Sequence, residues 1–218
     1  LLNQLLDRSY DVKNDRTSDR LLCLNTHYVK YVKYSIMMCV VVLCVVLTQL
    51  PSQCLYHAVY LAPMVFIYSY LKRYTPYVHF VLGAILGCVP VLFRVPFGGD
   101  ISYNVLLLGA CCALMITSSD MLYALQDLVF DRTVGLFSVP SVFGEDITIR
   151  LVHLLQCLTV LILGILAFQL SSILLMVGIF FVGGTFLRSN QKTLMIVNVT
   201  ISLIIMVCLF GECLWNMY

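Results

Sequence analysis

Seven long apolar runs, separated by short polar stretches, constrain this chain more than any other feature of its sequence. Hydrophobic residues make up 61% of the 218 residues and charged residues only 11%, whereas ordinary globular chains carry about 25% charged residues. Each run approaches the roughly 17–25 residues that a helix needs to cross a bilayer. Because backbone groups in the bilayer must be satisfied within the protein, we expect an all-α membrane protein, a multi-helix transmembrane bundle. The expected spans are Tyr34–Leu50, Gln53–Leu71, His79–Val95, Ile101–Leu128, Arg150–Leu170, Ser171–Leu187 and Thr193–Trp215.

Charged residues gather in alternate connections between these runs. If the runs span the membrane in order, the connections at 7–33, 72–78, 128–150 and 188–192 lie on one side. Twelve of the thirteen lysines and arginines fall there, and only Arg94 lies on the other side. The positive-inside rule makes the charged side cytoplasmic. We therefore expect a multi-pass integral membrane protein whose chemistry takes place at its cytoplasmic face.

Three aspartates and a tyrosine follow one another at regular intervals at the end of the fourth run. Tyr123, Asp127 and Asp131 follow Asp120 at intervals that place all four side chains on one helical stripe. Like charges four residues apart destabilise a helix by about 0.2–0.5 kcal/mol, and a charge in the bilayer costs about 2.5–3.5 kcal/mol. Such a stripe indicates a bound cation or another functional role.

A second acidic segment opens the chain with a matching spacing. Asn3, Asp7 and Asp11 are four residues apart and share one face of a helical end. Two acidic helix ends on one membrane side fit a pair of hard divalent cations such as Mg²⁺, which keeps positions for substrate phosphate oxygens. A diphosphate is therefore the expected guest, and Lys72 and Arg73 could bind its remaining oxygens.

Each acidic segment and the Lys72-Arg73 pair, taken alone, has a simpler interpretation. An acidic helix end is usually a solvated cap, and Lys72-Arg73 is usually an anchor at the membrane surface. That interpretation gives no reason for two matching stripes, or for the position of Asp120 well inside an apolar run. The ten cysteines form no CxxC pair, and the four histidines have no ligand spacing, so we expect no zinc site.

The two acidic segments resemble the hallmark motifs of the UbiA superfamily of intramembrane prenyltransferases, N-x-x-x-D-x-x-x-D and D-x-x-Y-A-x-x-D-x-x-x-D-x-x-x-G-x-x-S. The matching residues are Asn3, Asp7 and Asp11, continued by Asn14, Arg16, Thr17 and Arg20, and then Asp120, Tyr123, Ala124, Asp127, Asp131, Gly135 and Ser138. The family's Y-x-x-x-K loop is similar to residues 68–72. The strings YSYLKRYTPYVHFVLGAILG and YALQDLVFDRTVGLFSVPSVFG look most like the bacterial branch related to 4-hydroxybenzoate polyprenyltransferase.

The resemblance covers essentially the whole chain and implies a fold. The family has nine transmembrane helices around a cavity that opens to the cytoplasm and to lipid, and seven full spans plus the end of another are expected here. Residues 1–218 would form a single prenyltransferase domain that is N-terminally incomplete, because the first motif normally ends the second helix. A bacterial inner membrane is the implied location.

The resemblance also implies a reaction, in which Mg²⁺ holds a polyprenyl diphosphate while its prenyl group passes to an aromatic acceptor such as 4-hydroxybenzoate in ubiquinone or menaquinone biosynthesis. The implied metal ligands are Asn3, Asp7, Asp11, Asp127 and Asp131, and the implied diphosphate-binding residues are Lys72, Arg73, Arg8, Arg16 and Tyr68. Asp120 and Tyr123 are catalytic candidates that would orient the prenyl cation or the acceptor.

Several alternatives stay open. The acceptor could be a dihydroxynaphthoate or haem, and the prenyl chain length and oligomeric state are not determined. A cation-coupled transporter is a different class, but its carboxylates would lie near the bilayer midplane rather than at one face. A phosphatidyl-alcohol transferase would carry D-G-x-x-A-R, which is absent. No nucleic-acid partner is expected.

Overall fold

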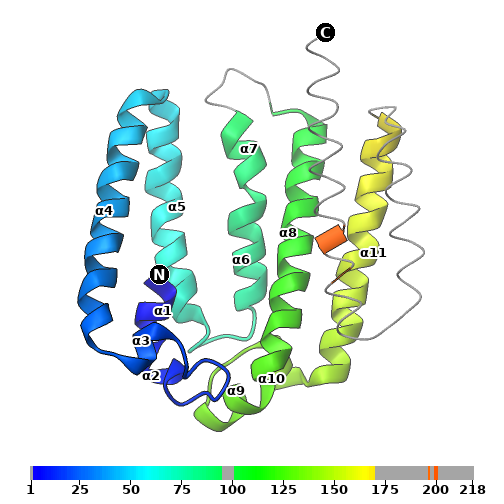
Figure 1. The fold of residues 1–218 in the computed structure, drawn as a ribbon. Coiled ribbons are helices and arrows are strands. Elements are labelled where there is room, and N and C mark those ends of the chain that lie inside the picture. Colours follow the sequence, from blue (N-terminus) through cyan, green and yellow to red (C-terminus); the bar gives the residue numbers. More distant parts are fainter. Residues whose placement is uncertain (1, 95–100, 170–195, 197–198, 201–218) are drawn as a thin grey trace.

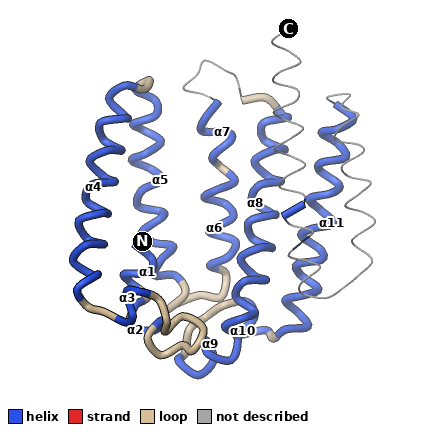
Figure 2. The backbone as a smooth tube through the Cα atoms, viewed as in Figure 1, coloured by secondary structure: helices blue, strands red, loops and turns tan. Residues whose placement is uncertain are grey.

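The structure is a computed structural model that describes residues 2–94, 101–169, 196, 199 and 200. Every regular element in this part of the chain is a helix, as Figure 2 shows. Four of these helices are long and apolar enough to cross a membrane: α4 (His27–Gln49), α5 (Ser52–Leu71), α8 with its continuation (Tyr103–Val134), and α11 (Glu145–Gln169). All four run along the length of the bundle, with α4 beside α5 and α8 beside α11 (Figure 1). The expected all-α membrane fold is confirmed.

The third expected span is built from two shorter helices. α6 (Val78–Gly87) and α7 (Val89–Arg94) are separated at Cys88. Pro90 lies in the first turn of α7, where the amide that proline lacks would have no partner within the helix. The break therefore leaves the backbone hydrogen-bonding pattern intact on both sides.

Two helices begin earlier than the apolar runs predict. α4 begins at His27 rather than Tyr34, and α11 begins at Glu145 rather than Arg150. In both cases the first turns carry polar residues that apolar periodicity cannot assign to a helix. Acidic residues are favourable in the first turn of α11 because they face the positive end of the helix dipole. The spans expected at 171–187 and 193–215 lie outside the described residues, apart from 196, 199 and 200.

The short elements gather at one end of the bundle, the lower end in Figure 1. The α4–α5 turn lies at the opposite end. Those short elements are α1 (Leu2–Leu6), α2 (Arg8–Asp11), α3 (Leu21–Leu24), η2 (Leu125–Asp127), α9 (Leu128–Val134) and α10 (Val139–Phe143). The charged connections at 7–33, 72–78 and 128–150 thus share one end, as expected for one membrane side, and the connection at 188–192 is outside the described residues.

Glycines allow α6 to pack closely on α8. A Cβ atom on Gly83 would lie 2.0 Å from Oγ1 of Thr117, and one on Gly87 would lie 2.8 Å from the carbonyl oxygen of Gly109. Small residues at helix contacts are typical of membrane bundles, because they let backbones approach. A buried cluster joins α8 to α10 and α11 at the end with the short elements; it comprises Met121, Leu122, Val139, Val152 and Leu155.

The α4–α5 pair is apolar and largely unburied by the rest of the described chain. α4 has no buried residue, and Ser69 is the buried residue of α5. Met38 of α4 is 68% exposed. Soluble proteins rarely expose an apolar surface of this extent, so these two helices are suited to contact lipid.

Candidate functional site

Both acidic segments of the sequence meet at one cavity at the end of the bundle that holds the short helices. The cavity has a volume of about 130 Å³ and lies among the first helices, the end of α5, the start of α6 and the end of α8. Its lining residues are Asn3, Asp7, Tyr68, Ser69, Lys72, Val78, His79, Asp120, Tyr123, Ala124 and Asp127. The structure therefore brings together candidate ligands from sequence positions more than a hundred residues apart.

The helical stripe predicted from Asp120 to Asp131 is interrupted. α8 ends at Ala124, and the 3₁₀ turn η2 carries Asp127 before α9 begins. A 3₁₀ turn has about 3.0 residues rather than 3.6, so the carboxylates beyond it are rotated away from a single straight stripe. The three aspartates of this segment consequently contact three different sets of partners.

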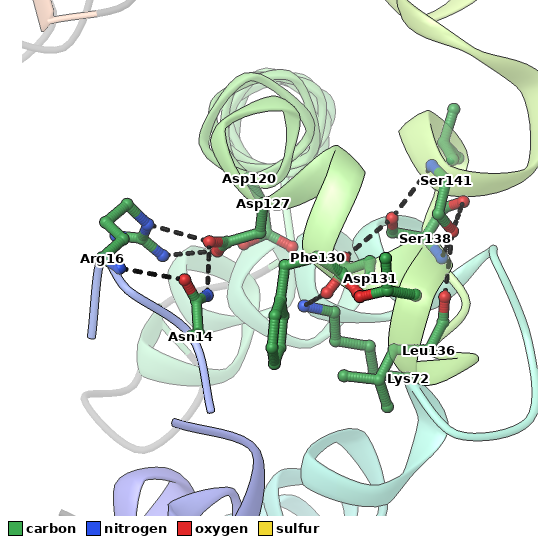
Figure 3. A network of polar contacts seen from close by, with 12 residues as sticks. Asn14, Arg16, Lys72, Asp120, Asp127, Phe130, Asp131, Leu136, Ser138 and Ser141 are labelled. Carbon is green, nitrogen blue, oxygen red and sulfur yellow. Dashed lines mark hydrogen bonds and ion pairs between the residues drawn. The ribbon is translucent and has the colours of Figure 1, made fainter. Parts of the chain in front are cut away.

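Asp127 is held by the segment that follows the first acidic motif (Figure 3). The Arg16 guanidinium forms a forked contact, with Nε donating to Oδ1 at 2.8 Å and Nη2 donating to Oδ2. Asn14 Nδ2 also donates to Oδ1 at 2.8 Å. Arg16 reaches further to the hydroxyl of Tyr123 at 2.8 Å, and its guanidinium lies 4.8 Å from the centre of that ring. The hydrogen bond to Asp127 raises the pKa of Arg16 further above its ordinary value.

Asp131 lies outside the cavity lining and is 1% exposed. Lys72 Nζ forms an ion pair with its Oδ1 at 3.0 Å, and Ser138 Oγ donates to its Oδ2 at 3.2 Å (Figure 3). The carbonyl oxygen of Lys72 accepts a hydrogen bond from the amide of Phe137 at 2.7 Å. Side-chain and backbone contacts thus join the end of α5 to the loop between α9 and α10.

Asp7 faces the same cavity from the first acidic segment. Arg73 Nη2 lies 3.8 Å from its Oδ1, and the Arg73 guanidinium lies 5.4 Å from the ring centre of Tyr10 and 5.1 Å from that of Tyr70. Burial raises the pKa of the Asp7 carboxyl above its ordinary value, and the charge of Lys72 partly offsets this effect. Arg73 is therefore fixed beside the cavity, with its charge close to Asp7.

Asp11 and Arg8, like Asp131, are predicted site residues that do not line the cavity. Asp11 accepts a hydrogen bond from Arg20 Nη1 at 2.8 Å. Arg8 Nε donates to the carbonyl oxygen of Leu22 at 2.7 Å. These two contacts hold the segment after the first motif against the motif itself.

Sequence reasoning missed His79. Its Nδ1 lies 2.7 Å from Oδ2 of Asp120, and it is 2% exposed. A single histidine has no spacing signal, and its partner is 41 residues away. The need of Asp120 for a partner inside an apolar run was the clue available in the sequence. Asn14 and Ser138 were visible only as motif positions, without an assigned role.

The oxygen donors at the cavity fit Mg²⁺ that arrives with a phosphate ligand. Asn3, Asp7 and Asp127 line it together, and Mg²⁺ usually takes one or two carboxylates and completes its shell with water and substrate phosphate oxygens. Within the described residues, no group of three or more His, Cys, Asp or Glu side chains is placed to hold a metal ion. Asn3, Asp7 and Asp127 are therefore described residues that could supply oxygen ligands to such a metal.

Comparisons with known proteins bear on the family and the fold of the chain. Residues 1–196 match the UbiA prenyltransferase family. Among solved structures, the apo structure of a UbiA homolog from Aeropyrum pernix K1 is similar, with a TM-score of 0.77 and 19% sequence identity over 94% of this chain and 82% of that chain. No curated protein sequence matches. Because the family match extends over most of the sequence, the chain belongs to the UbiA prenyltransferase family.

Proposed function

We propose that this protein transfers a polyprenyl group from a polyprenyl diphosphate to an aromatic acceptor, with Mg²⁺ as cofactor. Family membership supports a prenyltransferase that acts on aromatic acceptors. The observation that carries the proposal for this chain is the meeting of Asp7, Lys72 and Asp127 at one cavity. The acceptor we propose is 4-hydroxybenzoate or a related phenolic acid of quinone biosynthesis, with a dihydroxynaphthoate as the second candidate.

The carboxylates of the two acidic segments would hold the metal. Asn3, Asp7 and Asp127 line the cavity, and we assign Asp11 and Asp131 as further ligands once their present partners, Arg20 and Lys72, are released. When bound, Mg²⁺ neutralises charge on the leaving diphosphate and so favours ionisation of the allylic C–O bond.

Basic residues around the cavity would bind the rest of the diphosphate. Lys72 lines the cavity, and Arg16 and Arg73 reach carboxylates that also line it. A guanidinium binds phosphate oxygens through two parallel hydrogen bonds, whereas lysine acts as a point charge. Tyr68 lines the same cavity, and we also assign Arg8 to this group, although in this structure it binds the Leu22 carbonyl.

Residues of α8, together with Tyr68 of α5, would act on the prenyl cation and the acceptor. The rings of Tyr68 and Tyr123 at the cavity can face an allylic cation, because an aromatic face attracts positive charge. The Asp120 carboxylate lines the same cavity and can orient a hydroxyl group of the acceptor. These roles place bond cleavage near the basic residues and ring attack nearer to the bundle interior.

The proposed site belongs on the cytoplasmic side of a bacterial inner membrane. The supporting observation is that the short elements and the connections rich in lysine and arginine lie at one end of the bundle (Figure 1), which the positive-inside rule assigns to the cytoplasm.

The test is transfer of a labelled prenyl group in membranes that contain the protein. We expect Mg²⁺-dependent product that chelation abolishes, and a loss of about 100-fold or more for Asp127→Ala and Asp7→Ala. Asp19→Ala is the matched control, because Asp19 is an exposed acid of the same end. Activity that survives both site substitutions would refute the proposal. Competition between 4-hydroxybenzoate and a dihydroxynaphthoate then identifies the acceptor.

A further inference from the structure

We infer that His79 is a positioning residue, which fixes the carboxylate of Asp120 for contact with the aromatic acceptor. Both residues line the cavity, and Nδ1 of His79 lies 2.7 Å from Oδ2 of Asp120. The inference deepens the proposed function and rests on it for what Asp120 contacts. The pairing itself rests only on the geometry of α6 and α8.

The hydrogen bonds around the imidazole define its tautomer. The amide of Val139 donates to Nε2 of His79 at 3.4 Å. Because a backbone N–H can only donate, Nε2 must carry a lone pair, and the proton of a neutral imidazole then lies on Nδ1. Nδ1–H therefore donates to Asp120. This network describes a histidine that accepts a hydrogen bond at Nε2 and donates one from Nδ1 to the carboxyl group of Asp120.

The two side chains differ in their access to the cavity. The side chain of His79 is 3% exposed, whereas that of Asp120 is 24% exposed. Among the described residues, His79 is the hydrogen-bond partner of Asp120, through Oδ2. Asp120 is thus the more accessible of these two cavity-lining side chains. Asp120 can contact the substrate directly, and His79 acts through it.

Packing alone does not account for the pair. Gly83 and Gly87 already bring α6 against α8 with backbone-to-backbone proximity, and apolar side chains of similar volume often stabilise a buried contact as well as an ionic pair does. A buried donor aimed at a carboxylate instead restricts the rotation of that carboxylate. A catalytic group that is already fixed does not have to be ordered during the reaction, so the free-energy cost of ordering it is avoided.

Val139 connects this arrangement to the second acidic motif. Its amide holds His79, and the neighbouring Ser138 donates to Asp131. The start of α10 therefore contacts both the acceptor side of the site and the carboxylate that pairs with Lys72. Through these contacts the loop after α9 and the start of α10 support the cavity both beside Asp120 and beside Lys72.

Three substitutions separate the two hydrogen bonds of His79. His79→Asn keeps a donor near the position of Nδ1, His79→Gln keeps a polar group near the position of Nε2, and His79→Leu keeps neither. The measurements are kcat, KM for the acceptor, KM for the prenyl diphosphate, and the unfolding temperature in detergent. We expect His79→Gln and His79→Leu to lose about 10- to 100-fold in kcat/KM for the acceptor, with KM for the prenyl diphosphate unchanged, and His79→Asn to restore most of the activity.

Other results would overturn the inference. Activity of His79→Leu equal to that of the wild type would exclude a positioning role. Rescue by His79→Gln but not by His79→Asn would assign the effect to the Val139 contact instead. Losses that follow the unfolding temperature and affect both substrates equally would show a purely structural role.

A spectroscopic measurement keeps the inference separate from the proposed function. In protein with ¹⁵N-labelled histidine, His79 should give the signals of an imidazole that is protonated at Nδ1 and hydrogen-bonded there, and Asp120→Leu should shift the Nδ1 signal while the Val139 amide still holds Nε2. Protonation at Nε2 in the wild type would overturn the pairing. Wild-type protein that shows the Nδ1–H tautomer but transfers no prenyl group would overturn the proposed function and leave the His79–Asp120 pairing supported.

Discussion

Lys72 Nζ lies 3.0 Å from Oδ1 of Asp131, a carboxylate whose side chain is 1% exposed. The same pattern recurs at Arg16 with Asp127, Arg20 with Asp11 and Arg73 with Asp7. Each aspartate that we assign as a metal ligand therefore already has a basic partner. Binding of a metal with a diphosphate would exchange these partners, so that basic residues move from carboxylates to phosphate oxygens. Such an exchange keeps the buried charges compensated in both states.

Lys72→Met should destabilise the protein because it leaves Asp131 as an uncompensated buried carboxylate. Removing one partner of a buried ion pair costs about 3–5 kcal/mol, although the 32% exposure of the Lys72 side chain argues for the lower end. The double variant Lys72→Met/Asp131→Leu should recover part of the loss. Chemical unfolding in detergent measures both, and Lys33→Met, at an exposed lysine of α4, is the control. Equal stability of the single variant and the wild type would contradict the assigned ion pair.

Asp127→Ala should release the segment at 12–20 from the bundle. That segment reaches Asp127 through Asn14 and Arg16, and the substitution removes both contacts without changing a trypsin site. Because local opening controls cleavage of folded protein, trypsin should cut after Lys13 roughly ten times faster. Mass spectrometry of the fragments measures the rate, with cleavage after Arg150 as the internal control. An unchanged rate at Lys13 would show that other contacts hold the segment.

The sequence analysis singled out some of the residues that line the cavity, but not how each is held. Asp120, Tyr123 and Asp127 line one cavity together with Asn3 and Asp7, and a helical period was enough to group each set. The 3₁₀ turn at Leu125–Asp127 was not visible, because apolar periodicity does not report a local change in hydrogen-bonding pattern. That turn separates the partners of Asp127 from those of Asp131.

Long-range polar partners and helix starts were the other limits of sequence reasoning. His79 has no motif of its own, and only the packing of α6 on α8 brings it to Asp120. The start of α4 at His27 lies in a polar stretch, where lysines can extend their charged ends to the membrane surface. Apolar runs locate membrane spans well, whereas they do not reveal the polar turns that continue a helix beyond the bilayer.

Gly87→Ala should destabilise the contact between α6 and α8. The added Cβ would lie 2.6 Å from Cβ of Ala113 and 2.8 Å from the backbone oxygen of Gly109, so the helices must move apart. Overpacking of this kind typically costs about 1–3 kcal/mol. Gly164→Ala is the matched control, because a Cβ there meets nothing within 4 Å and alanine favours a helix. Thermal unfolding in detergent should show a lowered midpoint for Gly87→Ala and not for Gly164→Ala. A midpoint of Gly87→Ala equal to that of the wild type would contradict the close approach of the two helices.

Substitution of Gly135 should act through backbone conformation alone. Gly135 ends α9 with a φ of 72°, and a Cβ there would meet nothing within 4 Å. A left-handed conformation costs an ordinary residue roughly 1–2 kcal/mol, whereas asparagine tolerates it better. Gly135→Val should therefore lower stability by about that amount, and Gly135→Asn should lower it less. Because the turn leads to Ser138, which donates to Asp131, Gly135→Val should also reduce prenyl transfer. Unfolding and transfer assays on both variants provide the measurement, and equal losses for valine and asparagine would show that the left-handed turn is not what Gly135 supplies.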